Sequence, residues 1–359
     1  MTIGNNLHVI PEGIRSASED LWDALQKKSQ FPLAVMMAVT GRCNESCPHC
    51  EATTDAHIQD EMSLDVIQSI LSQLAAAGTL AITFTGGEPT LREDLCDIIA
   101  AASAEHFYVS LKTNASLLTD ARVDALVSAG LSAVNISLYH DIPEAHDRFV
   151  GYPGSWQRVM ASAERFHAAK VRTTLSLVAM NWNSDAVPRM ITECERKQFS
   201  YMVDTHIAPR VDGNDAPLKY QASPEQLAPI CSDPRILALD EIAKFPLPNP
   251  DRLVCGAGKG CCINYDGELM ACSRLPVSYG SLLSNRFEDL WLKSRARKGL
   301  TDLRWRDLPV CSECRLSKYC PKCLGCSLAG GSEIQPPSPE ECSYAKAVDM
   351  LLSSKYSEN

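Results

Sequence analysis

Strand-like apolar runs alternate with helical patterns over the first two-thirds of the chain. The strand-like runs cover residues 33–39, 80–85, 107–112, 133–138, 173–178 and 201–206, and the helical patterns cover residues 63–78, 91–104, 120–129, 155–169 and 185–197. In the first helical segment Ser63 is placed to cap the start and Gly78 to end the helix. Strands that alternate with helices predict βαβ units around a parallel sheet. Six such units form an incomplete TIM-like barrel, with the functional site at the carboxyl ends of the strands.

The loop after the first strand-like run carries three cysteines in the sequence Thr40-Gly-Arg-Cys-Asn-Glu-Ser-Cys-Pro-His-Cys50. At C-x3-C-x2-C spacing, the thiolates of Cys43, Cys47 and Cys50 hold three irons of a [4Fe–4S] cube and leave the fourth iron open to a small molecule. A structural metal site instead closes its ligand set with a fourth side chain. The alternative is a zinc knuckle or a set of unrelated thiols, and the motifs that follow favour the cluster.

The chain has 16 cysteines, far above average usage. It shows no signal-peptide pattern and no run of about 18 apolar residues. We therefore expect a cytoplasmic protein without a membrane partner, in which cysteine clusters bind metal and do not form disulfides. The formal net charge of −10 argues against nucleic-acid binding, which needs a basic face.

The segment Gly86-Gly87-Glu88-Pro89 follows the second strand-like run directly. Two glycines let the backbone approach a ligand closely and leave its N–H and C=O groups accessible. On its own the segment also fits a tight turn. Its place one βα unit after the cysteine loop favours a ligand site, because both loops then lie at the same end of the sheet.

The cysteine spacing, with His49 as the aromatic-type residue before the last cysteine, and the Gly-Gly-Glu-Pro segment resemble the radical S-adenosylmethionine (SAM) superfamily. That resemblance implies an incomplete TIM-like barrel and reductive cleavage of SAM to methionine and a 5′-deoxyadenosyl radical, which abstracts hydrogen from a substrate. It also implies that Gly86, Gly87 and Glu88 hold the amino group of the methionine moiety. The other positions implied to contact SAM or line the active site are Asn114, Ser137, Arg148 and Met180. Glu51 departs from the family, which often has an aromatic residue there, but it is not a ligand.

The pattern changes beyond residue 215. Residues 216–250 have the composition of a proline-rich linker, and ten cysteines follow within residues 251–359. A small domain of this kind gains stability from metal clusters. Asp266-Gly267 predicts a hairpin that brings Cys261 and Cys272 near one another. Cys261 and Cys262 must point to opposite sides of an extended chain, so only one of them readily faces a given cluster.

This region resembles the SPASM domain, whose pattern is C-x(9–15)-G-x4-C, then C-x2-C-x5-C-x3-C, then a final cysteine. The chain departs from this pattern after Cys320, where the next cysteine follows two residues and not three. Cys323 is the nearer match to the family position, and Cys326 is the alternative ligand. The resemblance implies two auxiliary [4Fe–4S] clusters, and a pair of zinc ribbons is the alternative. The implied ligands are Cys255, Cys261, Cys272 and Cys323 for auxiliary cluster I, and Cys311, Cys314, Cys320 and Cys342 for auxiliary cluster II. The cysteines expected to be buried structural thiols are Cys96, Cys194 and Cys231.

These patterns divide the chain into an N-terminal extension (1–30), a radical SAM barrel (31–215), a linker (216–250) and a SPASM domain (251–359). SPASM enzymes mostly modify peptides, so the resemblance implies a thioether or carbon–carbon crosslink in a ribosomally made peptide. It also implies SAM and three [4Fe–4S] clusters as cofactors, a reductant such as flavodoxin or ferredoxin, and, because the extension is short, a separate leader-binding protein. The alternatives are formylglycine maturation of a sulfatase, dehydrogenation or rearrangement of a small molecule, and a polyferredoxin-like electron carrier.

Overall fold

The computed structural model describes residues 25, 28–52, 58, 60–244, 247–308, 310–320, 322–328, 337 and 340–357. Six strands close to the predicted positions form a curved parallel sheet in the order β6-β5-β4-β3-β2-β1. They are β1 (Ala34–Thr40), β2 (Ala81–Gly86), β3 (Tyr108–Thr113), β4 (Ala133–Leu138), β5 (Arg172–Val178) and β6 (Ser200–Asp204). The prediction of an incomplete parallel barrel is confirmed. The predicted extension, residues 1–30, lies almost entirely outside the described residues.

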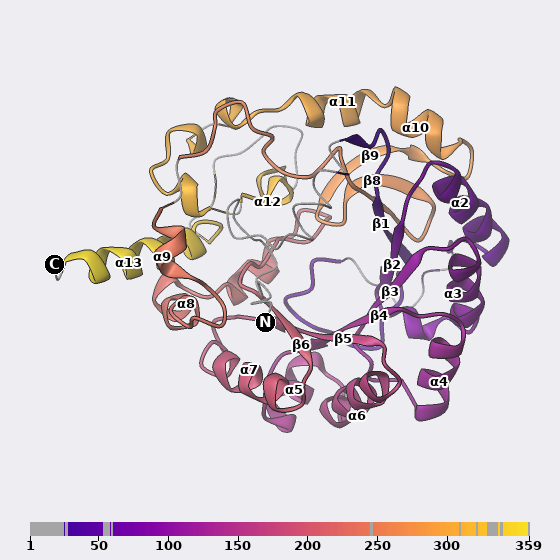
Figure 1. Cartoon of the computed structure of the whole chain (residues 1–359), viewed down its shortest axis with the longest axis horizontal. Coiled ribbons are helices and arrows are strands. Elements are labelled where there is room, and N and C mark those ends of the chain that lie inside the picture. The colour runs from indigo at the N-terminus through magenta and orange to yellow at the C-terminus, as the bar shows by residue number, and fades with distance from the viewer. Residues whose placement is uncertain are drawn as a thin grey trace.

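Helices cover the outer face of this sheet (Figure 1). They are α2 (Leu64–Ala76), α3 (Leu95–Ala104), α4 (Asp120–Ser128), α5 (Pro143–Val150), α6 (Ser155–Ala168) and α7 (Val187–Arg196). Ser63 caps α2 as predicted, with its Oγ accepting a hydrogen bond from the backbone N–H of Val66, and Gly78 follows with a φ of +88°. Helix α5 was not predicted, because its eight residues include too few apolar ones for a visible period; Pro143 begins it and Gly151 ends it in the left-handed conformation.

The strands have an apolar outer face and a polar inner face. On β3, Val109 and Leu111 are fully buried beneath the helices, whereas Ser110 and Lys112 alternate with them and are only half-buried. Successive side chains of a strand point to opposite faces, so Ser110 and Lys112 face the barrel interior. The interior of the barrel is therefore lined by polar groups near the carboxyl ends of the strands.

The cysteine-rich region extends the same sheet. Strand β7 (Cys261–Ile263) pairs in parallel with β1, and β8 (Glu268–Cys272) and β9 (Leu275–Ser281) follow in antiparallel pairs, which makes a nine-stranded sheet. The hairpin predicted at Asp266-Gly267 is confirmed, with a φ of +84° at Gly267. The continuity of β7 with the barrel was missed, because a three-residue strand has no period to read.

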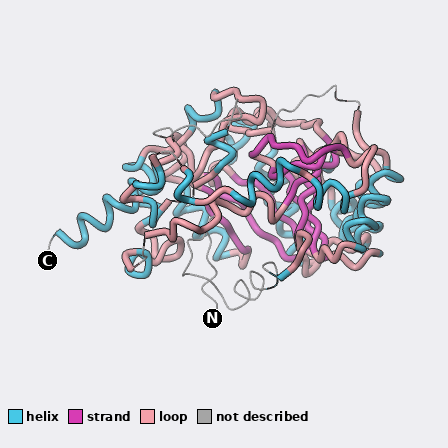
Figure 2. The backbone as a smooth tube through the Cα atoms, turned by 90° about the horizontal axis from the view of Figure 1, so that it is seen from above, coloured by secondary structure: helices cyan, strands magenta, loops and turns pink. Residues whose placement is uncertain are grey.

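The predicted linker contains helix α8 (Pro224–Cys231), whose start is closed by a capping box of Ser223 and Gln226. Helix α13 (Ser343–Ser357) packs against α8 and ends in the segment that projects from the molecule in Figure 2. The division into domains therefore stays a prediction. The other described elements are α9 (Leu239–Ile242), α10 (Phe287–Lys293), α11 (Arg295–Asp302), α12 (Leu324–Leu328) and the 3₁₀ turns η1 (Pro89–Leu91), η2 (Ala216–Tyr220), η3 (Trp305–Asp307), η4 (Cys311–Glu313) and η5 (Ser317–Tyr319). Among the described helices, none combines the length and apolar character needed to span a bilayer.

Candidate active site

Cys43, Cys47 and Cys50 lie together in the loop after β1, and all sixteen cysteines of the chain are free thiols. Burial raises the pKa of Cys43 to about 11, and the neighbouring Cys50 thiol adds to the shift. Burial also raises the pKa of Cys47, with contributions from both other thiols. Three adjacent thiols in surroundings that disfavour their anions fit a positively charged metal centre, which compensates the thiolate charge.

The two glycines after β2 allow the cysteine loop to come close. A Cβ on Gly86 would lie 2.2 Å from the carbonyl oxygen of Thr40, and one on Gly87 would lie 2.2 Å from that of Arg42. The backbone N–H of Gly87 donates to Thr40 at 2.9 Å, and that of Glu88 donates to Arg42 at 2.7 Å. The Gly-Gly pair is therefore a steric requirement of the contact between the β2 end and the cysteine loop, since any side chain there would push the loop away.

The Glu88 side chain is fully buried and turned toward the end of β3. Its Oε1 accepts from Thr113 Oγ1 at 2.7 Å and from the backbone N–H of Thr90 at 2.9 Å, and its Oε2 accepts from the backbone N–H of Asn114 at 2.7 Å. Burial raises the pKa of this carboxyl even so. Glu88 thus ties the ends of β2 and β3 together, and its predicted role toward the methionine amino group stays a prediction.

Asn114 connects the end of β3 to the cysteine loop. Its Nδ2 donates to Asn44 Oδ1 at 3.1 Å, and Asn44 in turn donates to Ser116 Oγ at 2.9 Å. On the other side of the loop, Glu45 Oε1 accepts from Ser155 Oγ at the start of α6 at 2.8 Å. The sequence analysis did not predict Asn44 and Glu45 as site residues, although their position between Cys43 and Cys47 pointed to the site.

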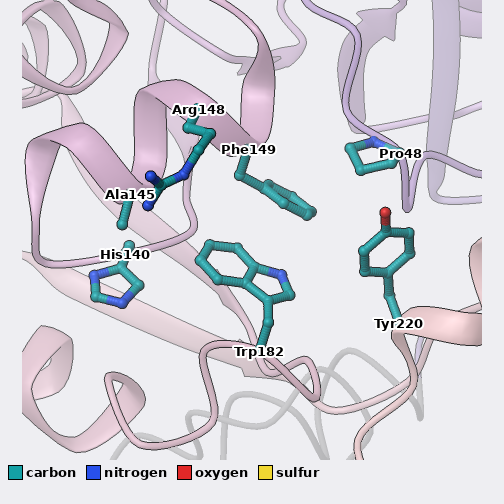
Figure 3. A pocket seen from close by; sticks show the side chains of 7 residues that line it. All are labelled: Pro48, His140, Ala145, Arg148, Phe149, Trp182 and Tyr220. Carbon is teal, nitrogen blue, oxygen red and sulfur yellow. The ribbon is translucent and has the colours of Figure 1, made fainter.

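An aromatic cavity of about 420 Å³ opens beside the cysteine loop (Figure 3). Its lining residues are Pro48, His140, Ala145, Arg148, Phe149, Trp182 and Tyr220. The Trp182 ring is stacked on His140 at 5.6 Å and lies 4.5 Å from the Phe149 ring. Two buried nitrogens at this site, His49 Nδ1 and Trp182 Nε1, have no hydrogen-bond partner in the described part of the chain. A buried polar group usually has a partner, so these two nitrogens are available to a group that the described chain does not supply.

The predicted contacts beyond Glu88 differ in their surroundings. Arg148 lines the cavity with an exposed side chain, and Ser137 is half-buried on the inner face of β4. Met180 is fully buried in a small apolar cluster with Tyr139 and Ile207, so its side chain lies beneath the cavity wall. Trp182 and Tyr220 form that wall, and the sequence did not predict either of them. Trp182 could have been found, because it comes only two residues after the predicted contact Met180.

Four cysteines of the C-terminal region form a second group. Burial raises the pKa of Cys320 to about 12, and Cys342, Cys311 and Cys314 all contribute. The other three therefore lie within electrostatic reach of Cys320, which is compatible with the predicted ligand set of auxiliary cluster II. Beside them the buried Lys322 Nζ and Glu341 Oε2 form an ion pair at 2.7 Å.

Two family models match the chain at these groups. The model of the radical SAM superfamily matches residues 37–194, and that of an iron–sulfur cluster-binding domain, SPASM, matches residues 255–326. Together they cover more than half of the chain. The chain belongs to the radical SAM superfamily and carries a SPASM domain. Membership makes it a radical SAM enzyme and implies SAM and [4Fe–4S] clusters as its cofactors.

Relatives extend over most of the chain. The PqqA peptide cyclase of Rhizobium meliloti is 27% identical over 329 residues, which cover 85% of this chain and 86% of the relative. The PqqA peptide cyclase of Ruegeria pomeroyi is 34% identical over 161 residues, or 45% of this chain and 43% of the relative. Among solved structures, Streptococcus suis SuiB bound to precursor peptide SuiA has a TM-score of 0.66 and 17% identity, covering 92% of this chain and 81% of that chain. Native anSMEcpe with bound AdoMet has a TM-score of 0.68 and 15% identity, covering 90% and 98%.

The predicted ligands of auxiliary cluster I are only partly brought together in this radical SAM enzyme. Burial raises the pKa of Cys255 to about 11, with contributions from Cys323 and Cys272. Cys261 has different neighbours. Burial raises its pKa as well, but the charges that act on it are those of the adjacent Cys262 and of Arg297. Cys255 thus lies within electrostatic reach of Cys323 and Cys272, whereas other charges act on Cys261.

Proposed function

We propose that this enzyme cleaves SAM reductively and uses the product to modify a ribosomally made peptide. The observation that carries the proposal is the set of Cys43, Cys47 and Cys50 at the carboxyl end of the barrel, pressed against the Gly86-Gly87 turn. The bound cofactors supply one-electron chemistry, in which SAM yields methionine and a 5′-deoxyadenosyl radical that removes a hydrogen atom from an unactivated carbon.

The residues of the chain bind and orient these groups. The three thiols hold the first [4Fe–4S] cluster, and the backbone of Gly86 and Gly87 lies beside it for the methionine moiety. The aromatic cavity suits the adenine ring, since its walls offer aromatic surface for stacking and Trp182 Nε1 has no hydrogen-bond partner among the described residues.

A peptide is the substrate best supported by the relatives. The PqqA peptide cyclases act on a peptide by name, and SuiB has been solved bound to a precursor peptide. We infer a thioether or carbon–carbon crosslink as the product, a flavodoxin- or ferredoxin-type reductant, and a separate leader-binding protein. Formylglycine formation is the second candidate, because anSMEcpe, with bound AdoMet and a Cp18Cys peptide, has a similar fold.

The C-terminal thiols hold two auxiliary clusters in this proposal. Cys311, Cys314, Cys320 and Cys342 bind auxiliary cluster II, and Cys255, Cys272 and Cys323 supply three ligands of auxiliary cluster I. Three cubanes correspond to about twelve irons per chain after anaerobic reconstitution. Stoichiometric zinc with little iron in anaerobically purified protein would instead support zinc ribbons.

The test is anaerobic incubation of the reconstituted enzyme with SAM and dithionite. The wild type should form 5′-deoxyadenosine, whereas an electron carrier would form none. Replacing Cys43, Cys47 and Cys50 with alanine should abolish it and lower iron from about twelve to about eight per chain. Cys231→Ala, a buried thiol outside all three groups, is the matched control and should keep both. Undiminished SAM cleavage in the triple variant would refute the assignment.

A further inference from the structure

The register of the sheet decides which cysteine of the Cys261-Cys262 pair turns toward the barrel interior. Cys261 pairs with Val35 of β1, and Cys262 pairs with Met36. Residues in register on neighbouring strands point to the same face. Val35 is buried in the main core under the helices, and Cys261 belongs to the same core. The Cys261 thiol therefore points into that apolar core.

The Cys272 thiol belongs to the other face. On β8, Leu269 and Ala271 are buried in the main core, and Cys272 alternates with them. By this alternation Cys261 and Cys272 point to opposite faces of the sheet, which disfavours a single cubane bound to both. Since Cys255, Cys272 and Cys323 are grouped, auxiliary cluster I needs a fourth ligand from elsewhere.

Cys262 shares the face of Cys272, because it pairs with Met270 on β8. Cys326 is the thiol next to Cys323. The ligand atoms of His206, Cys323 and Cys326 all lie within 4.8 Å of one another. Cys323 and Cys326 flank the start of α12 at C-x2-C spacing, which in bacterial ferredoxins places two ligands on one cluster. His206, just beyond the end of β6, has its Nε2 3.0 Å from the Cys326 sulfur.

We propose that Cys326, and not Cys261, is the fourth ligand of auxiliary cluster I, with His206 Nε2 as hydrogen-bond donor to its sulfur. This inference rests on the proposed function, which supplies the cluster. It also accounts for the departure of this chain from the SPASM spacing. The family pattern has one cysteine separated from the position of Cys320 by three residues, whereas here both Cys323 and Cys326 would bind the cluster. A thiolate ligand has no proton, so the Nε2 of His206 must carry one and donate it.

His206 then tunes the cluster without binding it. A hydrogen bond to a ligand sulfur stabilises the more negative, reduced state and raises the reduction potential. Removing the donor should therefore shift the potential of auxiliary cluster I downward and leave its iron in place. The shift belongs to one cluster, so the potentials of the other two serve as internal references.

The experiment compares Cys326→Ala, Cys261→Ala and Cys262→Ala after anaerobic reconstitution, by iron analysis, Mössbauer and EPR spectroscopy. Cys326→Ala should lose auxiliary cluster I or convert it to a three-iron form, whereas the other two should keep about twelve irons. Loss of iron in Cys261→Ala or Cys262→Ala, with retention in Cys326→Ala, overturns the proposal. If Cys326→Ala does not fold, a loss of iron in Cys261→Ala or Cys262→Ala still overturns it, and retention in both variants supports it.

His206→Leu and His206→Gln test the hydrogen bond by EPR-monitored redox titration. His206→Leu should keep its iron and lower one potential, and His206→Gln, which retains an N–H donor, should recover part of the shift. Iron loss in His206→Leu would make the imidazole itself the ligand and overturn the assignment of Cys326. A wild type with only about four irons would instead refute the auxiliary clusters, whereas the proposed function fails only if the wild type forms no 5′-deoxyadenosine.

Discussion

The Arg274 guanidinium lies 2.5 Å from the carboxylate of Glu51 and 3.2 Å from that of Asp204. Glu51 directly follows Cys50, Asp204 ends β6, and Arg274 comes two residues after Cys272. One cation therefore joins the first cysteine loop, the barrel and the SPASM hairpin. This ion pair explains why the chain has a glutamate at position 51, where the family often has an aromatic residue.

Arg274→Met should destabilise the protein by about 3 kcal/mol, because it removes the cation paired with the buried Asp204 and the partly exposed Glu51. Anaerobic urea unfolding measures the loss. The matched control is Arg315→Met, which removes an exposed pair with Asp349 and should change stability by less than about 1 kcal/mol. If both substitutions lowered the free energy of unfolding equally, the Arg274 ion pairs would stabilise the protein no more than an exposed surface pair does.

Gly87→Ala should prevent assembly of the first cluster. Its Cβ would meet the Arg42 carbonyl at 2.2 Å, so the cysteine loop must move. Iron should fall from about twelve to about eight per chain, together with SAM cleavage. Gly299→Ala on α11, where a Cβ meets nothing within 4 Å, is the control and should keep all its iron. A Gly87→Ala protein with full iron content would contradict the steric account.

Glu88→Gln should destabilise the protein and its SAM complex together. The new amide nitrogen faces donors such as Thr113 Oγ1 and the N–H of Asn114, and a buried group left unsatisfied costs about 1–3 kcal/mol. Urea unfolding and equilibrium dialysis with SAM report the two effects. Glu93→Gln, at an exposed neighbouring position, is the control and should leave stability and SAM affinity unchanged. If Glu88→Gln also left both unchanged, Glu88 would not have the structural role described above.

Trp182→Ala should weaken SAM binding about tenfold, because an aromatic stacking face contributes about 1 kcal/mol and the free Nε1 donor is lost as well. Trp182→Phe keeps the face and should lose about half of that free energy. Isothermal calorimetry on anaerobic enzyme measures both. Unchanged affinity in Trp182→Ala would place the adenine outside the aromatic cavity.

The local order of strands and helices was predictable, because it depends on neighbouring residues. The apolar alternation of β1 to β6 and the cap at Ser63 are properties of short segments, and the structure confirms them within a few residues. The cysteine spacings were equally local, since a cluster binds ligands at fixed separations along the chain. Helix α5 and strand β7 were missed because neither is long enough for a period.

The sequence by itself therefore determined the barrel and the family. Only the tertiary structure decided that Cys261 points into the core beside Val35, that Cys326 meets His206, and that Glu51 pairs with Arg274. These pairings join residues between 120 and 226 positions apart. Their geometry depends on the register between distant strands, and a shift of one residue would turn every side chain to the opposite face.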